Sequence, residues 1–123
     1  MSYKKQGDLG VAAAIKYYMD LGLLVSFPLT DTGRYDLVVD KGTLLRVQVK
    51  RTHRIAESGN YEASLTTKGG NQSWSGLVKK ITSDECDIVF ISTPDGDWEL
   101  PVSVVEGKGT ITLGKKYKQY RLG

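Results

Sequence analysis

Residues 35–51 read YDLVVDKGTLLRVQVKR, and this stretch decides the fold. Two runs rich in aliphatic and β-branched residues, 35–39 and 44–51, flank the short connection Asp40-Lys41-Gly42. Runs of this kind favour strands, and so short a connection joins neighbouring strands as an antiparallel hairpin. The stretch therefore predicts two paired strands.

Alternation along these strands separates an apolar face from a polar one, because successive side chains of a strand point to opposite faces. The apolar face takes Leu37, Val39, Leu45, Val47 and Val49. The other face takes Asp36 from the first strand and Gln48 and Lys50 from the second. Cross-strand pairing then allows an acid, an amide and a lysine to converge beside a core.

Outside the hairpin, the chain alternates between helical and strand patterns. Apolar residues at spacings of three and four predict a helix over about 8–21, ended by Gly22. A short helix is expected over 77–81, and strands are expected at 23–27, 61–65, 87–92, 98–101 and 110–113. We expect one domain over residues 1–123, of α/β class with a mixed sheet.

Composition fits a soluble protein, with 40% hydrophobic and 25% charged residues. Cys86 is the only cysteine, and no apolar run resembles a signal peptide or a membrane span, so a cytoplasmic protein without membrane contact is expected. The net charge of +3 is unevenly spread, since bases dominate 41–80 and every charged residue of 81–107 is acidic. This pattern favours a basic face for phosphates, against the alternative of chance clustering on a solvated surface.

The grouping of Asp36, Gln48 and Lys50 suits phosphodiester hydrolysis. Mg²⁺ prefers oxygen ligands, which the Asp36 carboxylate, the Gln48 amide and the Val49 carbonyl can supply. A bound metal polarises a phosphate and activates a water molecule, and a nearby lysine stabilises the developing negative charge. Each residue also has a plainer interpretation, as a polar side chain of an exposed strand.

The two strands resemble the motif pair of the PD-(D/E)XK nucleases, in which an Asp is followed, one hairpin later, by Asp/Glu-x-Lys. Here the second half reads Gln48-Val49-Lys50. The approach through Gly7-Asp8-Leu9-Gly10, a helix and 25–29 is similar to a branch that includes small intron-encoded homing endonucleases, and the resemblance covers about residues 5–52. It implies a restriction-endonuclease-like core, a mixed sheet flanked by helices, that cuts DNA with Mg²⁺, for which Mn²⁺ is expected to substitute.

The resemblance implies site residues as well. Asp36 is the expected metal ligand, Gln48 holds the second motif position, and Lys50 is the catalytic lysine. Many members carry an acid on the first helix, but Val11 stands where a Glu is expected. Asp8 is the nearby acid and is assigned to the catalytic and metal set, against the equal alternative that it is a helix N-cap. With Gln48 in place of an acid, the site is poor in carboxylates.

Basic and polar residues that follow the second strand are candidates for DNA contact. The set consists of Arg51, His53, Arg54, Lys68, Asn71, Gln72, Lys79 and Lys80. The alternative is an ordinary solvated edge and surface loop.

These patterns predict a Mg²⁺-dependent endodeoxyribonuclease that acts on double-stranded DNA, with site-specific homing as the favoured role. One alternative is a structure-selective nuclease of the Holliday-junction type, and another is a DNA-binding protein that has lost catalysis. Cutting both strands requires two active sites, so a homodimer or homotetramer is expected. We expect Trp98, Tyr117 and Tyr120 to serve its interface.

Overall fold

The computed structural model describes residues 3–30, 34–68 and 78–123. The helices are α1 (Tyr3–Asp20), α2 (Val102–Val105) and the 3₁₀ segment η2 (Lys115–Tyr120). The strands are β1 (Leu24–Ser26), β2 (Leu37–Asp40), β3 (Leu44–Arg51), β4 (Tyr61–Ser64), β5 (Thr66–Lys68), β6 (Val78–Lys80), β7 (Ile88–Thr93), β8 (Gly96–Pro101) and β9 (Thr110–Leu113).

Five strands form the main sheet in the order β1-β2-β3-β7-β8. Its pairs are antiparallel except β3–β7, which is parallel, so the mixed sheet expected from the sequence is confirmed. The predicted hairpin is the β2–β3 pair, in which Leu37 lies opposite Val47. Its turn depends on Gly42, whose φ of 92° lies in a region that side chains with a Cβ rarely adopt.

Helix α1 covers one face of this sheet. It begins five residues before Asp8, so the N-cap alternative for Asp8 is wrong. It ends as expected near Gly22, where φ is 77° and the Gly22 N–H donates to the Met19 carbonyl. At Gly10 the helix approaches β3 closely, because a Cβ there would lie 3.1 Å from Val49 Cγ1 and from Arg51 Cβ.

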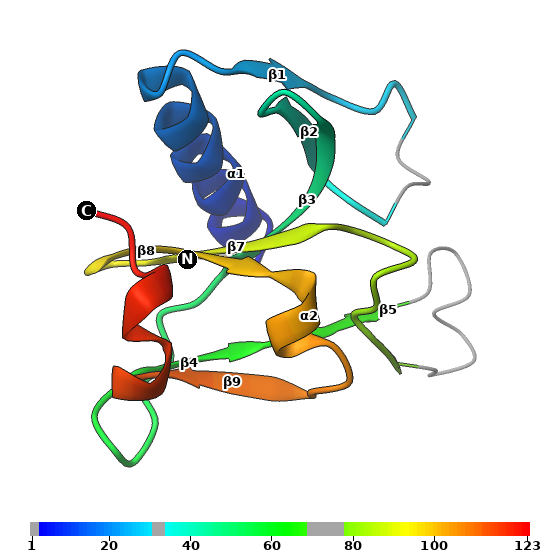
Figure 1. Cartoon of the computed structure of the whole chain (residues 1–123). Coiled ribbons are helices and arrows are strands. Elements are labelled where there is room, and N and C mark those ends of the chain that lie inside the picture. Colours follow the sequence, from blue (N-terminus) through cyan, green and yellow to red (C-terminus); the bar gives the residue numbers. More distant parts are fainter. Residues whose placement is uncertain (1–2, 31–33, 69–77) are drawn as a thin grey trace.

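The sheet has a buried apolar cluster on each face. The cluster under α1 contains Leu37, Val39, Val47 and Val49, as the alternation predicted. The cluster on the other face contains Val89 and Ile91 together with residues of β4, β8, β9, α2 and η2. Figure 1 shows α1 on one side of β7 and β8, with α2, β4 and β9 on the other. The polar face of the hairpin therefore faces a second layer of protein.

Two sequence predictions fail, and two short helical segments were missed. The expected helix at 77–81 is the strand β6, which pairs with β5, so a short ambiguous pattern was settled by pairing. The short helical segments α2 and η2 were not predicted. Trp98 and Tyr117 are buried in the second core cluster, so they are unavailable for the subunit interface that was expected of them. In the described part of the chain, no helix has the length and apolar character needed to cross a membrane.

Candidate nuclease site at the open end of the β2–β3 hairpin

Asp36 lies immediately before β2 and is bound to β3 through both backbone and side chain. Its N–H donates to the Val47 carbonyl at 2.8 Å. Its Oδ2 accepts the Val49 N–H at 2.7 Å and the Gln48 Nε2 at 3.1 Å. The acid and the amide that the sequence paired across the hairpin are thus in direct contact.

The carboxylate continues the sheet where β2 stops. Pairing with β3 begins at Leu37, and the Asp36 side chain takes the Val49 N–H that a longer β2 would have bonded through its backbone. In a strand, the N–H and C=O of one residue point to the same side. The Val49 carbonyl is therefore directed to the side on which the Asp36 carboxylate lies.

Lys50 reaches the same region from the next position of β3 on that face. Its Nζ donates to the Thr66 carbonyl at 2.9 Å. Burial lowers the pKa of Lys50, while the Asp36 carboxylate acts in the opposite direction and raises it. The site therefore pairs one carboxylate with one partly dehydrated ammonium, and charges of this kind interact more strongly than they do in bulk water.

The register of β3 against β7 sets the surroundings of the site. Gln48 lies beside Val89 and Lys50 beside Ile91, so both polar side chains are on the face of the second apolar cluster. Cys86 belongs to that cluster, and burial raises its pKa to about 11. Its thiol is protonated at neutral pH and forms part of an apolar wall. The sequence pattern did not point to Thr66 or Cys86, because both approach the site from remote parts of the chain.

The oxygen donors here fit a divalent cation of the Mg²⁺ type. Such an ion is held by one or two carboxylates with neutral oxygens and substrate phosphates. Asp36 supplies the carboxylate, the Val49 carbonyl lies on the same side, and Gln48 can present its amide oxygen if the amide turns over, since it now presents Nε2. Among the residues described, no group of three or more His, Cys, Asp or Glu could hold a metal.

Comparison with known proteins agrees with this geometry. A model of the PD-(D/E)XK endonuclease family matches residues 1–113. The chain belongs to the PD-(D/E)XK endonuclease family. Among solved structures it is similar to a bacterial homing endonuclease, I-Ssp6803I, with 26% identity and a TM-score of 0.82 over 98% of this chain and 89% of that one. No curated protein matches the chain.

Membership of this family identifies the protein as a DNA endonuclease with a restriction-endonuclease-like core, as the sequence motifs predicted. Nucleases of the PD-(D/E)XK family use divalent metals. DNA is accordingly the partner of the protein.

Asp8 of this PD-(D/E)XK endonuclease is exposed. Gln6 and Gly10 face the end of β3, because Gln6 Oε1 accepts the Arg51 Nε–H at 3.1 Å and a Cβ at Gly10 would lie 3.1 Å from Val49 Cγ1. At about 100° per residue, Asp8 is displaced by about half a turn from both of them. Its role in the site remains a prediction, and the helix face turned toward β3 carries an amide at Gln6.

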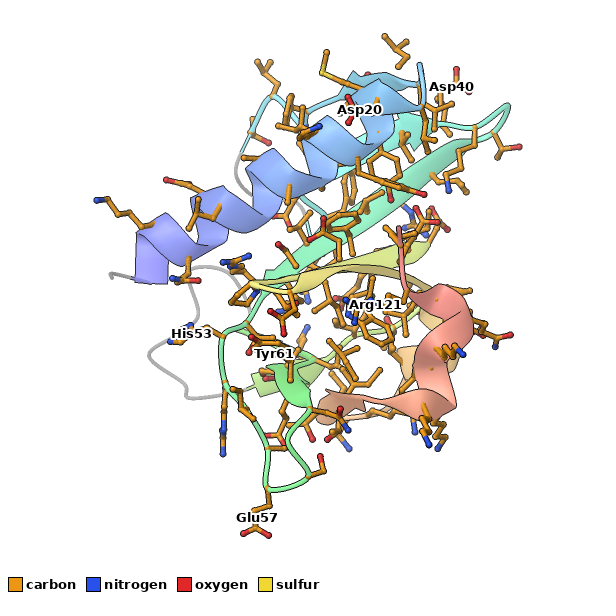
Figure 2. All side chains as sticks on the ribbon, turned by 90° about the vertical axis from the view of Figure 1, so that its left-hand side faces the viewer. Asp20, Asp40, His53, Glu57, Tyr61 and Arg121 are labelled. Atoms are coloured by element: carbon orange, nitrogen blue, oxygen red, sulfur yellow. The ribbon has the colours of Figure 1, made fainter. Side chains whose placement is uncertain are left out.

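The residues expected to contact DNA differ in their surroundings. Arg51 is half-buried, and its guanidinium donates to Gln6 Oε1 at 3.1 Å and to Ser92 Oγ at 2.9 Å. His53 and Arg54 are exposed where the chain leaves β3, and Figure 2 shows His53 at the surface. Arg54 also pairs with Glu62 at 3.5 Å.

The remaining candidates belong to the β5–β6 ribbon, a name used here for residues 66–68 and 78–80. Lys79 and Lys80 are exposed on β6, and Lys68 ends β5. Asn71 and Gln72 lie outside the described residues. Exposed basic residues thus occur on two segments, the chain after β3 and this ribbon.

Proposed function

We propose that this endonuclease cuts double-stranded DNA site-specifically with Mg²⁺ bound at Asp36, as a homing enzyme, and that residues 1–123 act as one nuclease domain. The observation that carries the proposal is the Asp36 carboxylate, held by the Val49 N–H and Gln48 on the face that also carries Lys50. The solved structure to which the chain is similar is that of a homing endonuclease. Mn²⁺ is expected to replace Mg²⁺, since both accept oxygen ligands.

Each residue of the site has a distinct role in this proposal. Asp36 would bind the metal directly, with the Val49 carbonyl and the Gln48 amide oxygen completing the protein ligands. The ion supplies polarisation of the scissile phosphate and a more acidic water. Lys50 donates from Nζ to the attacking water or to the phosphate oxygens, where charge develops in the transition state. The Val49 N–H orients the carboxylate, since Oδ2 is committed to it at 2.7 Å.

A duplex is cut on both strands, and one chain offers one such site. We therefore propose a homodimer or homotetramer whose active sites face the two strands. The exposed basic residues after β3 and on the β5–β6 ribbon would contact the phosphates. The described candidates are His53, Arg54, Lys79 and Lys80. Arg51 instead links β3 to α1 and β7, because its guanidinium donates hydrogen bonds to Gln6 and Ser92.

A second candidate, a DNA-binding protein that has lost catalysis, has one observation in its favour. Within the described residues, the carboxylates do not gather into a metal-binding group of three, and the second motif position is Gln48. This candidate predicts salt-sensitive binding to duplex DNA without cleavage at any Mg²⁺ or Mn²⁺ concentration.

The test is cleavage of a randomised duplex library with Mg²⁺ or Mn²⁺ by the wild type, Asp36→Ala and Lys50→Ala, with Asp40→Ala as the matched control. Asp40 ends β2 at the hairpin turn, as Figure 2 shows, whereas Asp36 lies immediately before the other end of that strand. We expect cleavage by the wild type and the control, and cleavage slowed by at least about 10²-fold in the two site variants. Undiminished cutting by Asp36→Ala would refute the site. Binding without cutting by the wild type would favour the second candidate, and preference for four-way junctions over duplex would indicate the structure-selective alternative.

A further inference from the structure

The Lys50 ammonium and the β5–β6 ribbon are joined by one hydrogen bond. Lys50 Nζ donates to the Thr66 backbone carbonyl at 2.9 Å. Thr66 is the first residue of β5 and lies opposite Lys80 of β6. Thr66, which accepts the hydrogen bond of Lys50, is therefore also part of the ribbon that carries exposed lysines.

The pairing pattern of the ribbon explains why this carbonyl is directed to Lys50. The Ile81 N–H donates to the Leu65 carbonyl at 3.3 Å, just before the first ribbon pair. Antiparallel ladders alternate between hydrogen-bonded and non-hydrogen-bonded pairs. Thr67 and Lys79 then form the next bonded pair, and the backbone groups of Thr66 between them point away from β6, toward Lys50.

The position of Thr66 is set from two directions. On one side, Leu65 is fully buried in the second core cluster, and its N–H donates to the Gly109 carbonyl at 2.9 Å. On the other side, β5 is paired to β6, where Lys79 and Lys80 are exposed. The core fixes where β5 begins, and the pairing with β6 fixes how the strand is rotated as it passes Lys50.

We propose that Thr66 is a positioning residue for cleavage: its carbonyl holds the Lys50 ammonium beside Asp36, and the β5–β6 pairing sets that position. An ammonium has three donors, so this bond uses one and leaves Nζ two more for the water or the phosphate. The ribbon that meets the DNA thereby controls the chemical step as well as binding. The inference rests on the proposed role of Lys50.

The experiment compares Thr67→Pro with Thr67→Val. Proline removes the N–H that bonds β6, whereas valine keeps that N–H and favours strands. DNA affinity is measured with Ca²⁺, the single-turnover rate at saturating DNA with Mg²⁺, and folding by thermal unfolding. We expect Thr67→Pro to cleave about 10- to 100-fold more slowly than Thr67→Val, as for a misplaced catalytic group, with an affinity within about threefold.

The same pair in a Lys50→Ala background shows whether the ribbon acts through the lysine. We expect no further loss from Thr67→Pro there, whereas an independent loss of the same size would overturn the inference. Equal rates for the two Thr67 variants, with Lys50→Ala strongly slowed, would overturn it while leaving the proposed function intact. Wild-type cutting by Lys50→Ala would overturn both.

Should Thr67→Pro fail to fold, β6 offers the equivalent comparison. Lys79→Pro and Lys79→Ala remove the same charge, and Lys79→Pro alone removes a ladder N–H. The inference expects Lys79→Pro to cleave about tenfold more slowly than Lys79→Ala at saturating DNA. Equal rates would refute it.

Discussion

The two ends of β2 each carry an aspartate that accepts a backbone N–H, and they differ in what else is present. At the turn, Asp40 Oδ1 accepts the Gly42 N–H at 2.9 Å, two residues away and exposed. At the open end, Asp36 Oδ2 accepts the Val49 N–H at 2.7 Å, thirteen residues away and partly buried. Figure 2 shows Asp40 near Asp20, at the far end of the sheet from His53.

The difference teaches that the partner strand gives an acid its function. Asp40 satisfies its own turn, as Asp commonly does, and needs no other element. Asp36 is reached by the amide of Gln48, and Lys50 from the same face of β3 influences it electrostatically. The same residue type therefore forms a local structural bond at one end and a candidate metal site at the other.

The largest expected effect comes from neutralising Asp36, and the same change at Asp40 serves as the control. Asp36→Asn keeps an acceptor for the Val49 N–H but replaces the metal-binding carboxylate by an amide. We expect the single-turnover rate to fall by about 10³-fold or more, in the range of losing a key electrostatic group. Asp40→Asn is the matched control, and its rate is expected to remain within about twofold of wild type because distant exposed sites contribute little to the chemical step.

Thermal unfolding of both variants separates chemistry from folding. Asn at either position still accepts the backbone hydrogen bond, so each loses at most about 1 kcal/mol of stability. If Asp40→Asn lost as much activity as Asp36→Asn at equal stability, the contrast between the two ends would collapse.

A second, intermediate effect is expected from restoring the acid at the second motif position. Gln48→Glu places a carboxylate next to Asp36, where the two like charges repel in the absence of metal. Bound Mg²⁺ relieves that repulsion, so we expect the variant to be less stable than wild type without metal and to bind Mg²⁺ about 10- to 100-fold more tightly. Calorimetric titration with Mg²⁺ measures this, with Gln48→Ala as the control. Unchanged affinity in Gln48→Glu would mean that position 48 does not face the ion.

The smallest effect is expected at a third aspartate, Asp87, which lies just before β7 and is hydrogen-bonded to β3. Asp87 Oδ2 accepts the Arg46 N–H at 2.8 Å and pairs with the Arg46 guanidinium at 3.0 Å. The side-chain hydrogen bond from Arg46 lowers the pKa of Asp87. A lowered carboxyl pKa stabilises the fold fully above the ordinary value, and this stabilisation is lost as pH falls through the lowered one.

The two side chains of this pair are 33% and 35% exposed, so solvent still screens the interaction, and we expect Asp87→Asn to lose about 1 kcal/mol at neutral pH. The difference from wild type should shrink on acidification and vanish once the pH is below the lowered pKa of Asp87, where the native carboxyl is protonated. Unfolding curves at both pH values check this. If the stability difference between wild type and Asp87→Asn grew on acidification, the pKa of Asp87 would not be lowered in the folded protein.

Most of the site was predictable because its parts lie within one hairpin. Alternation placed Leu37, Val39, Val47 and Val49 in a core, and the short turn brought Asp36 to Gln48. The assignment of Arg51 to DNA contact stays a prediction, and only the structure shows that its guanidinium also donates to Gln6 and Ser92, which are remote in the sequence. The helix expected at 77–81 became β6 because β5 was available to pair with it. The assignment of Asp8 stays a prediction.

The sequence by itself determined the hairpin, the two faces of β3, the class of metal and the family of the enzyme. The hairpin and the two faces follow from residues close in the sequence, whose geometry the two-residue repeat of a strand specifies. The family and its divalent metal follow from the motif that these residues resemble. Only the tertiary structure decided that Thr66 holds Lys50, that Cys86 lines the site and that Trp98 is buried. Those contacts join segments that are distant in sequence, and their positions depend on how the sheet, the second layer and the ribbon pack together.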